Sequence, residues 1–427
     1  MKVSKIGLIS RKITKLDEQF PVQDMLLQTG QIEQFTSGIY AYGHIPYLVK
    51  KNIDKVICKV LTKYGCSELS LPILQPEKIW VESGRLDKYV KEDVMFRTQT
   101  KYGNFCLAPT AEEAVVAYAK TRINTYKQLP VTYFQIGQKF RNEIRTRGYL
   151  LRGKAFDMMD AYSFGKSQEE LDYDYNQMKK AYLEIFETLG LKVQPVGADN
   201  GAIGGSKSEE FMCVSNIGED NILYDEETQT AFNKELLDRE DAKEYLLKNY
   251  GIKESDRLIE RKAVELGHIF QLGDKYASTM NGVYIDSDGK QKNYIMGCYG
   301  IGVSRTLAMV YENSAIYKDD KFDGISLPES VAPYKIYIVP KLDDSEKYKV
   351  AEKLYNELEN ANIDVLFDDR PELSIGAKIK DSKMVGTPYL VVVGKSVDNG
   401  VVELEKISTG EKIEIKIEEF VNYCKNL

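Results

Sequence analysis

The most basic stretch of this sequence runs from residue 139 to residue 154, where six basic side chains accompany a single carboxylate, that of Glu143. Lys and Arg neutralise phosphate charges, so such a cluster could bind a nucleic acid. The whole chain carries a net charge of −7, so a phosphate-binding surface has to be local. A charged hairpin exposed to water is the competing interpretation. The six bases are Lys139, Arg141, Arg145, Arg147, Arg152 and Lys154.

A second candidate for chemistry is the segment Gly300–Arg305, which has the form Gly-x-Gly-x-x-Arg. Glycines between a strand and a helix often serve only close packing, so the segment by itself indicates function weakly. Its meaning depends on the residues with which it is combined.

The length and composition predict a multidomain protein of the cytoplasm. At 427 residues the chain exceeds what one hydrophobic core usually supports. No apolar run approaches the roughly eighteen residues that span a bilayer, which excludes a membrane protein. The six cysteines show no CxxC or CxxH spacing, so we expect reduced thiols.

Hydrophobic spacing predicts the elements that position the charged residues. Helical periodicity covers 48–64 and 167–190, the second of which begins after the capping residue Ser167. Segments 131–143 and 155–164 are typical of two antiparallel strands, which makes the basic stretch the loop of a hairpin.

The composition changes beyond residue 200. Residues 201–262 are rich in glycine and then strongly charged, which predicts a surface insertion. Two prolines within 324–335 indicate a further boundary, after which strands alternate with helices. This alternation predicts a small α/β domain at 331–427.

Taken together, these segments resemble the three motifs of class II aminoacyl-tRNA synthetases, in that family's order. They are a helix and strand ending at Pro72, then Phe140–Glu143 with Arg152 and Phe156, and finally Gly300–Arg305. The resemblance implies an α+β catalytic domain, an antiparallel sheet flanked by helices, on which a carboxylate attacks the α-phosphate of ATP. Because that carboxylate is already ionised, positioning and cations do most of the work.

Within this class the chain resembles the prolyl-tRNA synthetases of the bacterial type over nearly its whole length. The segment 367–394 is similar to the anticodon-binding domain shared by the glycyl, threonyl, prolyl and histidyl enzymes. The stretches that carry the prolyl resemblance are 26–46, 74–89, 107–115, 158–164, 197–212, 267–276 and 296–305.

The bacterial enzymes often carry a large editing domain between the second and third motifs, but the span from Phe164 to Glu265 is too short for one. We therefore expect a catalytic domain in two parts, a short connection between them, and an anticodon-binding domain. The expected bounds are 1–200 and 263–330, 201–262, and 331–427 respectively.

The family pattern implies how ATP is bound. Arg141 would grip the α-phosphate and Arg305 would reach the γ-phosphate, so both are candidate catalytic residues. Adenine would lie between Phe156 and Arg305, with Glu143 accepting from its amine. Mg²⁺ is expected with ATP, without an implied set of ligands. The expected ATP-binding residues are Arg141, Glu143, Arg152, Phe156, Glu265, His268, Gly300, Gly302 and Arg305.

The same pattern implies a site for L-proline. Thr110 and Glu112 would hold its secondary amine, which offers two N–H donors to a hydroxyl and a carboxylate. Apolar side chains would enclose the ring. The expected proline-binding residues are Thr110, Glu112, Arg141, Met158, Asp160, Tyr162, Phe270 and Cys298.

The resemblance also implies tRNA(Pro) as a partner and a homodimer as the assembly. Arg145 and Arg147 follow the second motif and are the candidates for contacting the acceptor end of tRNA. In the C-terminal domain the candidates are Arg370, Lys378 and Lys380.

Several positions depart from the family pattern, among them Thr146 and Gly148 of the basic loop, where a proline and an aromatic residue are commoner. Ala155 and Met159 stand where a glutamate and a lysine are usual, and Glu209 stands where a histidine is usual. These changes bear on the specificity for proline more than on the use of ATP.

The leading interpretation is an enzyme that uses ATP to form prolyl adenylate and transfers proline to tRNA(Pro). One alternative is an adenylating paralogue that loads another acceptor, against which the retained C-terminal domain argues. Another is a non-catalytic tRNA-binding regulator, against which Arg141, Glu143 and Arg305 argue.

Overall fold

The computed structural model divides into two compact units. The central unit comprises residues 37–39 and 54–306, and the terminal unit comprises residues 1–36, 40–53 and 307–427. None of the described helices is long and apolar enough to cross a membrane. The structure describes residues 1–9, 13–198, 203–225, 230–252 and 258–427.

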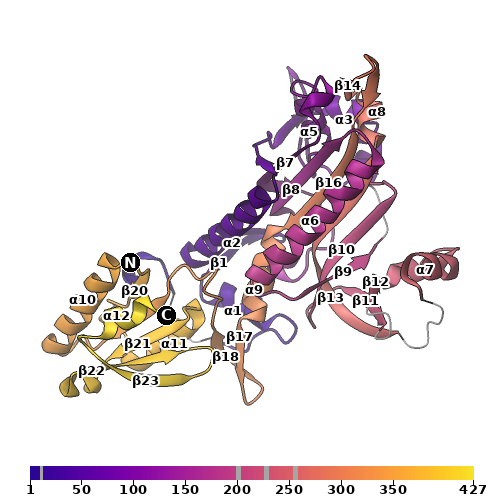
Figure 1. Ribbon diagram of the computed structural model, residues 1–427. Coiled ribbons are helices and arrows are strands. Elements are labelled where there is room, and N and C mark those ends of the chain that lie inside the picture. The colour runs from indigo at the N-terminus through magenta and orange to yellow at the C-terminus, as the bar shows by residue number, and fades with distance from the viewer. Residues whose placement is uncertain (10–12, 199–202, 226–229, 253–257) are drawn as a thin grey trace. The chain divides into compact units, whose positions relative to one another are not determined.

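The central unit is built on a nine-stranded sheet with the order β10-β9-β12-β11-β13-β16-β8-β7-β3 (Figure 1). Strands β7, β8, β16 and β13 run antiparallel to one another, which confirms the predicted antiparallel sheet, whereas the short β3 pairs with β7 in parallel. The strand expected to end at Pro72 is shorter than predicted. The bounds are β3 Ser67–Glu68, β7 Val131–Phe140, β8 Ala155–Gly165, β9 Val193–Gly197, β10 Lys207–Val214, β11 Asp220–Asp225, β12 Thr230–Asn233, β13 Ile259–Gly273 and β16 Ile295–Gly302.

Helix α6 (Gln168–Thr188) packs against β8, β13 and β16. The side chain of Ser167 accepts a hydrogen bond from the backbone N–H of Glu170, as its predicted role as a cap requires. The buried side chains recur every three or four residues, so they form one stripe along the helix. This stripe consists of Leu171, Tyr175, Met178, Tyr182 and Ile185.

Residues 201–262 differ from the predicted surface insertion, because three of the strands in this range belong to the nine-stranded sheet. Met212 and Ile222 are buried there in one cluster with Val196 and Ala263. The charges that suggested an insertion belong largely to the end of this range, which holds the short helices η4 (Lys234–Asp238) and α7 (Ala242–Tyr250).

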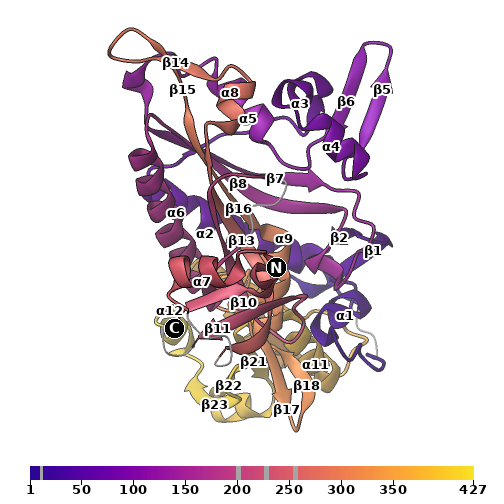
Figure 2. The ribbon, with the colours of Figure 1, turned by 90° about the vertical axis from the view of Figure 1, so that its right-hand side faces the viewer.

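A small helical region lies beside the sheet and holds a three-stranded sheet of its own (Figure 2). Gly84 ends its first helix with φ +75°, a left-handed conformation that glycine adopts without strain. The chain turns there, which places Arg85 at the start of the next helix. The elements are β4 Leu74–Pro76, α3 Glu77–Ser83, α4 Leu86–Lys91, β5 Arg97–Thr100, β6 Gly103–Leu107, α5 Glu112–Ala119 and α8 Lys275–Thr279.

The C-terminal part of the terminal unit is the predicted α/β domain. Its five-stranded sheet has the order β20-β19-β21-β22-β23, in which the first three strands are parallel. The strands are β19 Ile336–Pro340, β20 Val365–Phe367, β21 Tyr389–Val393, β22 Val401–Lys406 and β23 Glu411–Lys416. The helices are α10 Ser345–Asn360, α11 Ile375–Val385 and α12 Phe420–Lys425.

Candidate active site

A cleft of about 390 Å³ opens in the central unit. Every residue that the sequence predicted for ATP or proline lines it, although these positions span almost two hundred residues of the chain. They are Thr110, Glu112, Arg141, Glu143, Arg152, Phe156, Met158, Asp160, Tyr162, Glu265, His268, Phe270, Cys298, Gly300, Gly302 and Arg305.

The floor of the cleft is one face of the sheet. Side chains at alternate positions of a strand point to the same face, and β8, β16 and β13 each contribute residues with this spacing. The register also makes them neighbours across the strands. Cys298 lies opposite Tyr162 and Phe270, Gly300 lies opposite Asp160 and His268, and Gly302 lies opposite Met158.

Arg305 is fixed at one end of the cleft by the backbone around it. Its Nε donates to the carbonyl oxygen of Leu151 at 3.1 Å. One terminal nitrogen donates to Glu265, at 2.6 Å to the carbonyl oxygen and 2.9 Å to a carboxylate oxygen. The guanidinium is therefore held in place before any ligand binds, which lowers the cost of binding an anion.

Arg141 is held in a similar way. Its Nε donates to the carbonyl oxygen of Pro109 at 3.2 Å, and its guanidinium lies 5.3 Å from the ring centroid of Phe156. This distance is within the range of a cation–π interaction. The cationic guanidinium of Arg141 thus lies beside the flat apolar ring of Phe156.

Charged side chains join the hairpin loop to the loop between β10 and β11. Arg152 donates to Glu143 at 3.0 Å and to Glu219 at 3.1 Å. Arg147 also lies 3.8 Å from Glu219. Glu219 lines the cleft, and the sequence had not identified it, because it lies in the range that we had interpreted as an insertion.

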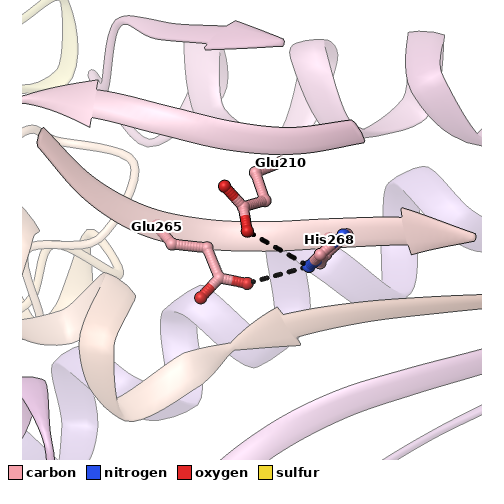
Figure 3. Close-up of side chains that lie close together, drawn as sticks. All are labelled: Glu210, Glu265 and His268. Carbon is pink, nitrogen blue, oxygen red and sulfur yellow. Dashed lines mark ion pairs between the residues drawn. The ribbon is translucent and has the colours of Figure 1, made fainter. Parts of the chain in front are cut away.

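Glu210, Glu265 and His268 form a cluster whose charged atoms lie within 4.8 Å of one another (Figure 3). The Nδ1 atom of His268 lies 3.3 Å from Glu265 and 3.6 Å from Glu210. Burial alone would raise the pKa of Glu265, but the hydrogen bond with His268 and the charge of Arg305 lower it to about 2. Burial, followed by the negative charge of Glu265, raises the pKa of Glu210 to about 8.

A buried carboxylate, that of Glu112, lies at the other end of the cleft. It accepts from the hydroxyl of Thr110 at 2.6 Å and from the thiol of Cys298 at 3.2 Å. Arg85 donates to it at 3.1 Å. Burial opposes the charge of Glu112, but Arg85 and these hydrogen bonds lower its pKa, so the carboxylate stays ionised.

Asp160 marks the middle of the floor and is part of a buried ion pair. Lys139 lies 2.6 Å from one of its oxygens, and Gln135 donates to the other at 2.8 Å. We had counted Lys139 in the basic stretch, but only 2% of it is exposed. Its charge is thus neutralised under the cleft, and it does not belong to a surface that binds phosphates.

The departures from the family pattern lie outside the cleft. Within the described residues, Ala155, Met159 and Glu209 are not among those that line it. Met159 is fully buried, and Glu209 pairs with Lys179 at 2.6 Å and accepts from Tyr175 at 2.9 Å. None of these three residues therefore contributes a side chain to the lining of the cleft.

The residues predicted for tRNA differ in their exposure. Arg145 and Lys380 are exposed, and so is Arg147. Arg370 is buried between Asp368 and Asp381, at 2.6 and 2.9 Å.

Lys378 is 1% exposed and donates to the carbonyl oxygen of Asp368 at 3.1 Å. The structure thus contradicts the expectation that Arg370 and Lys378 contact RNA, because their charged groups are paired inside the domain. Lys380 remains the candidate in this domain.

The sequence did not identify Arg85, although this residue donates a hydrogen bond to Glu112, the buried carboxylate of the cleft. It lies in the stretch 74–89, which carried part of the family resemblance. No spacing connects it with Glu112, because the two residues belong to different elements that meet only in the folded chain.

Two family models match the chain. The tRNA synthetase class II core domain (G, H, P, S and T) matches residues 93–314, and the anticodon binding domain matches residues 335–427. The chain is 38% identical to the proline-tRNA ligase of Rickettsia bellii over 420 residues, which covers 96% of this chain and 95% of that one.

The proline-tRNA ligase of Fusobacterium nucleatum is 31% identical over an alignment of 571 positions, which covers all of this chain and 99% of that one. Since this chain has 427 residues, part of that enzyme has no counterpart here.

The fold is similar to that of a crystal structure of prolyl-tRNA synthetase from Cryptosporidium parvum complexed with halofuginone and AMPPNP. The TM-score is 0.75 at 16% identity, over 99% of this chain and 79% of that one. A second structure of that protein, complexed with L-proline and AMP, has a TM-score of 0.73.

Proposed function

This chain belongs to the proline-tRNA ligases, a family of class II aminoacyl-tRNA synthetases, and we propose that the cleft is where its two reactions occur. It activates L-proline with ATP to prolyl adenylate and transfers the prolyl group to the 3′ end of tRNA, with release of pyrophosphate and AMP. The observation that carries the assignment of the site is that the residues expected for ATP and for proline line one cleft, in which Glu112 is buried and Arg141 and Arg305 are held by hydrogen bonds to the backbone.

The carboxylate end suits proline. The two N–H groups of its secondary ammonium would donate to Thr110 and Glu112, whose oxygens lie 2.6 Å apart. Tyr162 and Phe270, both buried, would enclose the ring. An ionised Glu112 in an apolar surrounding favours a cation strongly, because few water molecules screen the charges there.

The arginine end suits ATP. Arg141 would bind the α-phosphate together with the carboxylate of proline, and adenine would stack between Phe156 and Arg305. The proline carboxylate then attacks the α-phosphorus, and pyrophosphate leaves. Arg141 would stabilise the negative charge that builds on the phosphate in the transition state.

Glu210 and Glu265 are the residues we propose for holding Mg²⁺. Their carboxylate oxygens lie close enough together for one ion, and Mg²⁺ prefers oxygen ligands. When bound, the ion would neutralise charge on the phosphates of ATP.

For the second reaction, we propose that Arg145 and Arg147 contact the acceptor end of tRNA and that Lys380 contacts its anticodon arm. The terminal ribose hydroxyl attacks the carbonyl carbon of the adenylate, and AMP leaves. The homodimer implied by the family is likewise a proposal, which the mass of the particle in solution tests.

The experiment that tests the function is exchange of pyrophosphate into ATP, measured with each of the twenty amino acids. Exchange that depends on proline supports the proposal, and exchange that depends on another amino acid contradicts it. Charging of tRNA(Pro) by the same preparation excludes a paralogue that loads another acceptor.

A further inference from the structure

Arg85 is buried behind the carboxylate end of the cleft, with 6% of its surface exposed. One terminal nitrogen donates to Glu112 at 3.1 Å and to Glu113 at 3.0 Å. The other donates to the hydroxyl of Tyr89. The guanidinium thus connects a residue of the cleft with residues that do not line it.

Three aromatic rings surround this guanidinium. Its carbon lies 5.2 Å from the ring centroid of Trp80, 4.7 Å from that of Tyr89 and 5.2 Å from that of Tyr276. The rings exclude water and favour a cation through their faces. Burial opposes the charge of Arg85, but Glu112 and Glu113 outweigh it and raise its pKa, so Arg85 keeps its proton.

We propose that Arg85 is a positioning residue for recognition of the secondary ammonium of proline, because it keeps the carboxylate of Glu112 ionised and in place. The proposal rests on the proposed function, since it assigns the ammonium to Glu112. Arg85 does not line the cleft and acts through the carboxylate that does.

Charge balance supports this role. Glu112 and Glu113 together carry two negative charges when ionised, and Arg85 carries one positive charge. In that state the buried cluster lacks one positive charge, which the ammonium of proline supplies, whereas Arg85 alone balances Glu112 once Glu113 takes up a proton. A ligand of the same shape without a cation leaves the deficit, which is costly in a site of low dielectric.

Glu113 differs from Glu112 in its surroundings. It accepts from the hydroxyl of Ser83 at 2.8 Å and does not line the cleft. Burial raises its pKa to about 7, with Arg85 opposing and Glu112 adding to the shift. Glu113 is therefore the member of the pair that takes up a proton first, which leaves the charge on Glu112.

The test is the variant Arg85→Met in proline-dependent pyrophosphate exchange. We expect the KM for proline to rise on the order of 10²-fold near pH 7, the scale for removing one partner of a buried charge pair. The KM for ATP should stay within about threefold, because the arginine end of the cleft is intact.

A pH profile separates this role from a purely structural one. Without Arg85, burial leaves Glu112 protonated at neutral pH, and kcat/KM for proline should recover as the pH rises from 6 to 9. The wild-type protein should show a smaller change over this range, set by Glu113, because Glu112 stays ionised throughout it. The groups that face Glu112 and also titrate or carry charge are Arg85, Glu113, Tyr89, Tyr162, Lys275, Tyr276 and Cys298.

Tetrahydrofuran-2-carboxylate gives a second measurement, because an ether oxygen replaces the ammonium of proline. Its inhibition constant against proline should change by less than about threefold in Arg85→Met, since it makes no charge pair with Glu112. A loss of affinity for both ligands alike would show that Arg85 only shapes the pocket, and would overturn the proposal.

Arg97→Met is the matched control, because Arg97 pairs with Glu77 at 2.9 Å in the same helical region but has no contact with Glu112. It should lower the melting temperature without a change in the KM for proline. If Arg85→Met does not fold, Arg85→Lys and the double variant Arg85→Met/Glu113→Gln replace it.

A KM for proline within about threefold of wild type in both folded replacements would overturn the proposal. The proposed function fails separately, if the wild-type protein itself shows no proline-dependent exchange.

Discussion

Two buried arginines, one in each unit, have almost the same surroundings. Arg85 lies between Glu112 and Glu113, and Arg370 lies between Asp368 and Asp381; each is 6% exposed. Both clusters hold two carboxylates for one guanidinium, next to tyrosine hydroxyls.

The two clusters differ in what the carboxylates face. Glu112 lines a cleft, whereas the oxygens of Asp368 are taken up by Arg370 and by the hydroxyl of Tyr337. Burial and charge pairing therefore do not distinguish a substrate site from a structural one. The distinction lies in whether one member of the cluster keeps a free direction toward a cavity.

The largest effect that we expect concerns the structural arginine. Arg370→Met should lower the free energy of unfolding by about 3–5 kcal/mol, because it leaves two buried carboxylates without their cation. Urea unfolding at pH 7 measures this loss. The folded variant should keep the KM values for proline and ATP. A selective rise in the KM for proline would contradict the view that Arg370, unlike Arg85, has a purely structural role.

Arg141→Ala should have a comparable effect on catalysis and little on stability. We expect the rate of adenylate formation to fall on the order of 10² to 10³-fold, the scale for losing one donor to the transition state. Arg141 is only partly buried, so unfolding in urea should change little. The same measurements on Arg305→Ala should agree, and near-normal exchange in both variants would show that ATP binds elsewhere.

The apolar side chains that enclose the proline ring should discriminate between amino acids less strongly than the charged residues that bind its ammonium. A missing methylene is worth roughly 1–3 kcal/mol, or about 10 to 200-fold. We expect the enzyme to form alanyl-tRNA and, because cysteine is close to proline in volume, cysteinyl-tRNA. Accumulation of both with purified protein measures this, and rapid enzyme-dependent deacylation of alanyl-tRNA would reveal an editing site that the short chain was predicted to lack.

The smallest effect should come from the exposed cations Arg145 and Arg147 of the hairpin loop. Replacing Arg145 and Arg147 together by alanine should lower the charging of tRNA and reduce its salt dependence, by about one unit of slope for each lost phosphate contact. Pyrophosphate exchange should stay normal. An equal loss of exchange would place these residues in the ATP site instead.

Much of the lining of the cleft could be predicted, because the family resemblance named its residues and some of them also follow a local pattern. Met158, Asp160 and Tyr162 are spaced by two on a strand, so they share a face wherever that strand lies. The segment ending at Arg305 places its charge at a junction of strand and helix.

Other predictions were wrong because a local pattern does not report burial. Lys139 belongs to the basic stretch 139–154 and Arg370 to the acidic segment 367–372, and each is buried beside an acid. The strands within 201–262 were not predicted, because the charged residues near them made the whole range look like a surface insertion. Lys139 meets Asp160 on the neighbouring strand, and Arg370 meets Asp381 of α11 as well as its neighbour Asp368.

The sequence by itself determined the order of the elements, the antiparallel hairpin of the second motif, the face of α6 that is buried, and the family. The elements follow from spacing along the chain, since hydrophobic periodicity acts within a single element, and the family follows from the resemblance of the motifs.

Only the tertiary structure decided that Arg85 meets Glu112, that Lys139 lies under the cleft, and that Arg370 is unavailable to RNA. The reason is physical: charges in an apolar interior are placed only where packing brings an opposite charge within hydrogen-bonding distance. That partner can come from any element of the fold.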